Sequence, residues 1–185
     1  LTLMCGTHVT PRPQALVSFY GYGDIVGDWY SRPDPFYCKK ERVSEREARA
    51  ALERECISNG DGKNDRFRFY LWCRQNGQWP KEIMGIDPAR DPEAFAPYCP
   101  VRNVTPEFPP ALLFHGTGDT DVPYQQSALM ASALQAAQVP HGLVTYDNAP
   151  HGFEGGLKRE ELEAVVPVPR ADATLRTVRF LKRWL

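Results

Sequence analysis

The 185-residue sequence has no apolar run long enough to cross a lipid bilayer, so we expect no membrane span. It also lacks a marked excess of either charge. Its 22 basic and 23 acidic side chains are intermixed and give a formal net charge of −1. This balance excludes the strongly basic surface that nucleic-acid-binding proteins use, so nucleic acid is not an expected partner.

Cysteine motifs that hold zinc or carry out redox chemistry are missing as well. The five cysteines are widely spaced, and no two of them form a Cys-x-x-Cys pair. Reduced and mostly buried thiols fit this pattern and favour a cytoplasmic location. The first residues lack the charged segment and the long apolar core of a signal peptide. Residues 1–6 resemble the end of a helix instead, and we expect the chain to begin inside a fold.

Three short apolar runs predict buried strands. They cover residues 15–20, 111–114 and 143–146, and proline, glycine or other turn residues bound them. Apolar residues at helical spacing predict helices over residues 123–138 and 171–185, each after one of the later two strands. Strands that alternate with helices are typical of the α/β class with parallel strands, and the length fits one domain.

A long insertion, at about residues 21–107, separates the first two predicted strands. Ser44 and Glu47 form a capping box that predicts a helix running toward Glu55, and a second helix is expected over residues 66–75. Because so long a segment is rarely a bare loop, we expect a helical lid over a pocket. A passive surface elaboration is the alternative. The aromatic side chains that could line an acyl pocket, or equally form a core, are Trp29, Tyr30, Phe36, Phe69, Tyr70, Trp72 and Trp79.

Two chemically active side chains follow neighbouring predicted strands. Asp119 lies in a glycine-rich turn after the second strand, and His151 lies between Pro150 and Gly152 after the third. Functional groups of open parallel sheets collect at the carboxyl ends of the strands, so the two side chains are expected to meet. A carboxylate that fixes an imidazole makes it a general base, which indicates an acid–histidine pair with Asp119 and His151 as candidate catalytic residues.

Each of these assignments has a competitor. Asp121 or Asp24 could supply the acid, and Asp119 could instead serve only to cap its turn. His151 could be an ordinary exposed loop histidine. His115 closes a buried strand, and we interpret it as a structural, hydrogen-bonded residue. No metal and no organic cofactor is expected.

The chain resembles the last third of an α/β-hydrolase. The resemblance rests on His115-Gly116-x-x-Asp119-x-x-Val122-Pro123, followed by Ala149-Pro150-His151-Gly152-Phe153. It is strongest for the acetylesterase/lipase branch, which is related to the serine peptidases of the prolyl oligopeptidase type. In these families the chain order is Ser, then Asp or Glu, then His, and this order implies that Asp119 is the triad acid and His151 the base.

The nucleophile of such a triad is missing from the sequence. No Gly-x-Ser-x-Gly string occurs, none of the serines lies between flanking glycines, and the HGGG-type segment of the oxyanion hole is absent. These gaps predict that the chain is the C-terminal portion of a hydrolase and that the serine lies outside it. Alone, the chain is then expected to be inactive.

The resemblance implies a hydrolase that acts on small-molecule carboxylic esters. The alternatives are a peptidase of the prolyl oligopeptidase type, and an inactive fragment that serves as an interaction protein. The strand at residues 15–20 would have lost a neighbour from the parent sheet. We therefore expect the chain either to depend on the missing N-terminal half or to form a homodimer through that exposed edge.

Overall fold

The computed structural model describes residues 1–53 and 66–185. These residues form two compact units. The sheet unit comprises Leu1–Asp24 and Pro97–Leu185, and the inserted unit comprises Ile25–Ala96. No helix in the described parts of the chain is long and apolar enough to cross a membrane.

The sheet unit is built on three parallel strands in the order β1-β2-β3. They are β1 (Leu16–Phe19), β2 (Ala111–Gly116) and β3 (His141–Tyr146). Leu16 of β1 pairs with Ala111 of β2, which in turn pairs with His141 of β3. All six residues of β2 are buried, and for residues 111–114 this is what the apolar run predicts for a strand covered on both faces. The predicted parallel α/β class is confirmed, although β2 and β3 are each two residues longer than expected.

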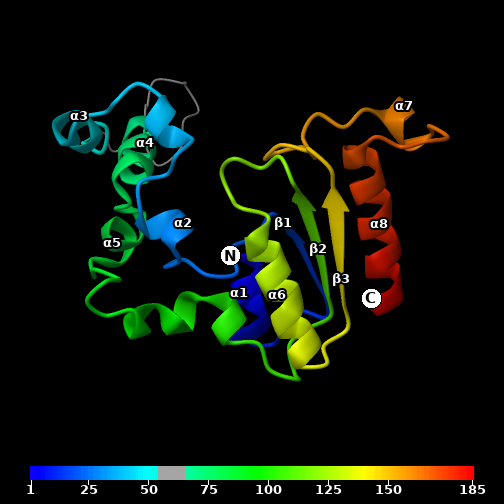
Figure 1. Ribbon diagram of the computed structural model, residues 1–185. Coiled ribbons are helices and arrows are strands. Elements are labelled where there is room, and N and C mark those ends of the chain that lie inside the picture. Colours follow the sequence, from blue (N-terminus) through cyan, green and yellow to red (C-terminus); the bar gives the residue numbers. More distant parts are fainter. Residues whose placement is uncertain (54–65) are drawn as a thin grey trace. The chain divides into compact units, whose positions relative to one another are not determined.

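Helices cover both faces of this sheet (Figure 1). On one face α1 (Thr2–His8) and α6 (Gln125–Ala136) pack against the strands. On the other face lies α8 (Pro169–Trp184). The shorter elements of the unit are η3 (Pro100–Arg102) and α7 (Arg159–Leu162). The three layers hold β2 rigidly in the middle, so the loop after β2 starts from a fixed point.

Helical spacing predicts an apolar stripe on each long helix, with Leu129, Met130 and Leu134 on the first and Val178 on the second, and these predictions are only partly correct. In α6, Met130 and Leu134 are fully buried, but Leu129 is 48% exposed. In α8, Val178 is also exposed, because the helix approaches the sheet through the small Ala173. A small residue brings the helix backbone close to the strands and turns other apolar positions of the helix toward solvent.

The inserted unit is helical. It contains α2 (Asp28–Ser31), η1 (Tyr37–Lys39), α3 (Glu45–Ala50), α4 (Phe67–Asn76) and α5 (Trp79–Met84), and η2 (Glu93–Tyr98) crosses its boundary. The predicted capping box is present, since the Ser44 hydroxyl accepts from the Glu47 amide and the Glu47 carboxylate accepts from the Ser44 amide. This helix ends at Ala50, so it is shorter than predicted; residues 54 and 55 of that prediction lie outside the described residues.

Aromatic side chains form the core of the inserted unit. Phe69 and Trp72 are buried in one cluster with Tyr37, which favours core packing over pocket lining for Phe69 and Trp72. Phe36 is partly exposed. Whether the unit acts as a lid stays a prediction.

The described cysteines differ in exposure. Cys73 and Cys99 are buried, Cys5 is half-buried and Cys38 is exposed. Cys56 lies outside the described residues. The expectation of mostly buried thiols is therefore met for the first two of these residues, and Cys38 departs from it.

Candidate active site

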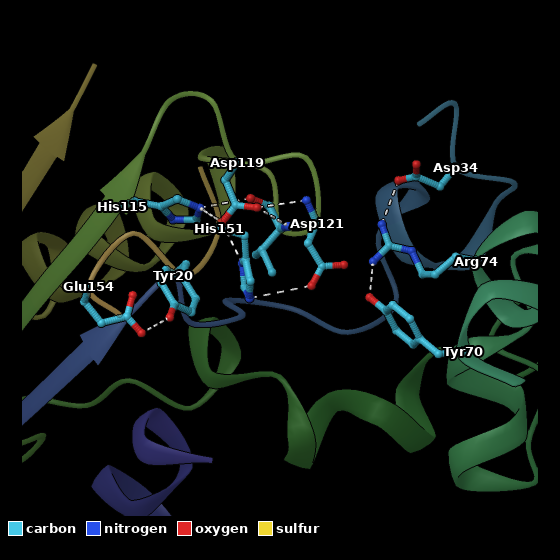
Figure 2. A network of polar contacts seen from close by, with 10 residues as sticks. Tyr20, Asp34, Tyr70, Arg74, His115, Asp119, Asp121, His151 and Glu154 are labelled. Atoms are coloured by element: carbon cyan, nitrogen blue, oxygen red, sulfur yellow. Dashed lines mark hydrogen bonds and ion pairs between the residues drawn. The ribbon is translucent and has the colours of Figure 1, made fainter. Parts of the chain in front are cut away.

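Asp119 is held in a tight turn that follows β2. Its Oδ1 atom accepts hydrogen bonds from the amides of Asp121 (2.8 Å) and Val122 (2.9 Å). This local pattern is typical of an aspartate that organises its own turn, and it fixes the carboxylate relative to the strand end. The side chain is fully buried, and its second oxygen, Oδ2, points toward the neighbouring loop (Figure 2).

The loop after β3 brings His151 to this carboxylate. The Nδ1 atom of His151 lies 2.9 Å from Asp119 Oδ2, at hydrogen-bonding distance. Because Asp119 is an acceptor only, Nδ1 carries the proton and the other ring nitrogen, Nε2, is left as the basic atom. The imidazole is 37% exposed, so Nε2 can be reached by a reacting group. The structure therefore joins the two side chains that the sequence predicts to meet.

Glycine allows the two loops to come this close. A Cβ atom on Gly116 would overlap the backbone carbonyl of Ala149, and one on Gly118 would lie 2.6 Å from the Asn148 carbonyl oxygen. The loops are also joined by a hydrogen bond from the Asn148 amide to the Thr117 hydroxyl (2.8 Å). The glycines that flank the turn are thus needed for close backbone approach.

His115 is fully buried and stabilises the turn that carries Asp119. Its Nε2 atom lies 2.9 Å from the Val122 carbonyl oxygen, and its Nδ1 atom lies 2.7 Å from the Ser127 hydroxyl. Since a carbonyl only accepts, we assign the proton to Nε2, and Ser127 then donates to Nδ1. The same Nε2 is 3.4 Å from Asp119 Oδ2. This geometry agrees with the structural, hydrogen-bonded role expected for His115.

The contacts of the pair favour its charged form. Burial alone would raise the pKa of Asp119, but hydrogen bonds from His115, His151 and the turn amides outweigh it and lower that pKa. The hydrogen bond to Asp119 raises the pKa of His151 against the opposing effect of burial, and the nearby carboxylates of Asp119, Asp121 and Glu154 add to the rise. The imidazolium is therefore stabilised where it would form during general-base catalysis.

We expect the ring of His151 to titrate above the usual histidine value of about 6.5. The raised pKa means that the protonated form stabilises the folded state. That stabilisation is complete below the unfolded pKa and is lost as the pH rises through the folded pKa. An NMR titration of the ring resonances of the four histidines measures the value directly. A midpoint for His151 at or below about 6.5 would contradict the electrostatic picture.

The two alternative acids are placed differently. Asp121 Oδ2 lies 3.7 Å from Nε2 of His151, on the side of the ring opposite to Asp119. The backbone amide of Asp24 donates to the side-chain oxygen of Gln126 (2.9 Å). Only Asp119 accepts from Nδ1, which is the position that an orienting acid requires. Within residues 1–53 and 66–185, no three His, Cys, Asp or Glu side chains are arranged to hold a metal ion.

Two residues next to His151 were not predicted from the sequence. The ring centroid of Tyr20 lies 4.1 Å from that of the imidazole, and the Tyr20 hydroxyl donates to Glu154. Tyr20 ends the first apolar run, where it resembles one more core aromatic. Its position at the carboxyl end of a strand was the signal available.

The serine hydroxyls of the sheet unit and the inserted unit do not complete a triad. Ser127 is bonded to His115, and the hydroxyls of Ser31 and Ser132 donate to backbone carbonyls of their own helices or of the preceding loop. Ser44 caps its helix. No serine among the described residues is hydrogen-bonded to His151, whose imidazole bonds to Asp119.

One known family and several solved structures match parts of this chain. The model of a family described as the prolyl oligopeptidase family matches residues 57–166, which include Asp119 and His151. No curated protein matches the chain significantly in sequence. A Staphylococcus aureus subsp. aureus Mu50 protein with unknown function is 22% identical, with a TM-score of 0.58. The match covers 92% of this chain and 56% of that protein, so the chain has the same fold and spans about half of its length.

Two further solved structures have lower TM-scores. A puromycin-hydrolyzing peptidase of Mycobacterium tuberculosis is 18% identical with a TM-score of 0.46, and the match covers 89% of this chain and 16% of the peptidase. The native esterase Est2 of Thermogutta terrifontis is 25% identical with a TM-score of 0.41, over 60% of this chain and 34% of the esterase. At these scores the similarities carry no argument about substrate.

Proposed function

The chain belongs to the prolyl oligopeptidase family, and we propose that it provides the acid and the general base of a serine hydrolase of the α/β-hydrolase type. The family match and the parallel three-stranded sheet confirm the predicted resemblance to this superfamily. The observation that carries the proposal is the hydrogen bond between Asp119 and His151, formed at the carboxyl ends of adjacent parallel strands.

In the proposed reaction, His151 acts through its Nε2 atom. It takes the proton of a serine hydroxyl as the serine oxygen attacks the carbonyl carbon of the substrate, and it later gives that proton to the leaving group. Asp119 keeps the proton of the imidazole on Nδ1 and stabilises the imidazolium, without itself being protonated. Water then hydrolyses the acyl-enzyme, with His151 again serving as the base.

The serine is proposed to come from residues outside the 185-residue sequence. No serine of the sequence lies in a Gly-x-Ser-x-Gly elbow, including Ser58, which is outside the described residues. The backbone amides of the oxyanion hole would come from the same outside segment. In the strand order β1-β2-β3, the outer edge of β1 is where a further parallel strand could pair.

The proposed substrate is a small carboxylic ester, as the sequence resemblance implies. A second candidate substrate is a peptide bond. The family match favours it, because the family takes its name from a peptidase. The acid–histidine pair serves both reactions, since each passes through attack on a carbonyl carbon followed by protonation of the leaving group.

The test compares two proteins with two substrates. The 185-residue chain, and the same chain extended by the residues encoded upstream in its reading frame, are assayed with a short-chain aryl ester and a matching aryl amide. We expect no turnover by the 185-residue chain, because the covalent step lacks its nucleophile. Turnover is expected for the extended protein and should be lost in the His151→Ala variant. His141→Ala, in a strand histidine whose ring lies against the Val139 carbonyl, is the matched control.

Three outcomes would contradict the proposal. Turnover by the 185-residue chain that is lost in His151→Ala would refute an outside nucleophile. Full activity of the extended His151→Ala variant would refute the role of His151. An upstream reading frame without a Gly-x-Ser-x-Gly string would remove the proposed serine.

A further inference from the structure

Tyr20 has a backbone conformation that aromatic residues rarely adopt. Its φ angle is +41°, at the point where β1 ends and the chain turns at Gly21. A bulky residue with positive φ is strained, and such strain persists only where the surroundings fix the residue. Here the Tyr20 amide donates to the Phe114 carbonyl of β2 (2.7 Å), which holds the backbone in this conformation. Strained residues of this kind cluster at functional sites.

The strained backbone directs the ring of Tyr20 onto His151. The two ring centroids are 4.1 Å apart and the planes are inclined by 48° (Figure 2). Edge contacts with His115 and Phe153 surround the ring, at centroid distances of 6.4 Å and 6.2 Å. The phenol is thus packed from several sides and covers one face of the imidazole.

Glu154 fixes the far end of the same ring. The Tyr20 hydroxyl donates to Glu154 Oε1, and this bond connects the end of β1 to the loop that carries His151, three residues away along the chain. The second oxygen of Glu154 is buried without a hydrogen-bond partner among the described residues. Burying such an oxygen costs free energy. The Glu154 carboxylate is therefore kept in place at a cost, which indicates a role beyond packing.

The imidazole needs this second contact to have a defined orientation. Its hydrogen bond to Asp119 fixes the Nδ1 atom but allows the ring to rotate about that bond, and over a third of the side chain is exposed. Rotation would change the direction in which Nε2 points. A ring packed against one face of the imidazole restricts this rotation.

We propose that Tyr20, anchored by Glu154, is a positioning residue that sets the plane of the His151 imidazole and so aims Nε2 at the reacting group. The inference rests on the proposed function for its catalytic meaning. Its geometric content, a defined ring orientation imposed by Tyr20, can be tested in the 185-residue chain without any catalysis.

The test follows the ring protons and ring nitrogens of His151 by NMR in four variants. Tyr20→Gly removes the ring and relieves the positive φ, so the variant is expected to fold. Its His151 ring protons should move downfield, because they lose the shielding of a tilted aromatic ring whose centroid lies 4.1 Å away, and the ring should become more mobile. Tyr20→Phe keeps the ring but removes its anchor, and Glu154→Gln weakens the anchor by removing the charge of the acceptor. Both should give smaller shifts in the same direction. Tyr98→Phe, at an exposed tyrosine, is the control and should leave His151 unchanged.

A second readout uses the extended protein of the preceding subsection. Tyr20→Gly is expected to lower kcat by up to about 100-fold, as misplacement of a reacting group does, with little change in KM. Glu154→Gln should lower kcat less, also without changing KM. A residue that only stabilised the fold would alter the amount of active enzyme, and neither the mobility of the His151 ring nor the kcat of the folded enzyme.

Two results would overturn the proposal: His151 resonances in Tyr20→Gly that match those of the unsubstituted chain, or a Tyr20→Gly enzyme with unchanged kcat. Its failure is distinguishable from failure of the proposed function. If His151→Ala retained activity while Tyr20→Gly still shifted the His151 resonances, the catalytic role would fall and the positioning contact would stand.

Discussion

Asp119→Asn is expected to lower kcat of the extended protein, which includes the proposed serine, by about 10⁴-fold while leaving the fold intact. The asparagine oxygen can still accept from the amides of Asp121 and Val122, so the turn should keep its shape. The amide nitrogen would then face Nδ1 of His151, where the carboxylate oxygen now lies. Because that nitrogen can only donate, Nδ1 would have to accept, and the proton of the imidazole would move to Nε2. The ring would have the wrong tautomer for removing a proton from serine.

The measurement is hydrolysis of an aryl ester by the variant, together with its thermal unfolding. Asp121→Asn and Asp24→Asn are the matched controls, since they remove the same charge at the two alternative acids. Both should retain far more activity than Asp119→Asn. A larger loss for Asp121→Asn would assign the acid to that residue. A variant Asp119→Asn that is active but unstable would reduce Asp119 to a residue that caps its turn.

The pair of Asp119 and His151 could be predicted from the sequence because the signals for each residue lie close to it in the chain. Residues 111–114 are apolar throughout, which predicts a strand buried on both faces, and parallel strands place their carboxyl ends at the same edge. The glycines beside Asp119 and His151 marked loops that come close together. Each of these inferences uses only a few adjacent residues, and the structure joins the two side chains as expected.

The sequence did not suffice for Tyr20, because its role depends on contacts with distant residues. Its positive φ is held by a carbonyl of β2, and its hydroxyl partner lies 134 positions away. Its position at the carboxyl end of a strand is the only local signal, and a core aromatic residue at a strand end has the same position. The exposure of Leu129 was missed for a related reason. Helical spacing gives the apolar stripe, but only packing against the sheet decides which part of it is buried.

Arg74 is a charged residue of α4 that the structure buries almost completely. Its side chain is 1% exposed, and its guanidinium donates to Asp34 Oδ2 (2.7 Å) and to the Tyr70 hydroxyl (2.8 Å). Four aromatic rings lie within 5.7 Å of it, those of Trp29, Tyr30, Tyr37 and Tyr70. Asp34 is 40 positions away, and so distant a partner cannot be inferred from the residues around Arg74.

Arg74→Met is expected to lower the free energy of unfolding by about 3–5 kcal/mol, because it removes one member of a buried ion pair and leaves the other charge without it. Methionine keeps much of the volume and can still pack against the aromatic rings. The stranded group is the Asp34 carboxylate, whose side chain is 13% exposed. Its other oxygen keeps the amides of Phe36 and Tyr37, which is too little to replace the guanidinium. Urea unfolding of the two proteins measures the difference.

Arg32→Met is the matched control, because Arg32 pairs with Asp28 at 3.0 Å but both side chains are more than 70% exposed. Solvent screens such a pair, so this change should cost at most about 1 kcal/mol. Arg74→Lys keeps the positive charge but loses the planar guanidinium that donates to both Asp34 and Tyr70. Its decrease in unfolding free energy should lie between those of Arg74→Met and Arg32→Met. If the compact unit Ile25–Ala96 can open while the sheet persists, Arg74→Met should increase hydrogen exchange mainly at backbone amides of this unit. Equal unfolding free energies for Arg74→Met and Arg32→Met would show that the buried pair does not hold the unit together, and the stability would then have to come from its aromatic core.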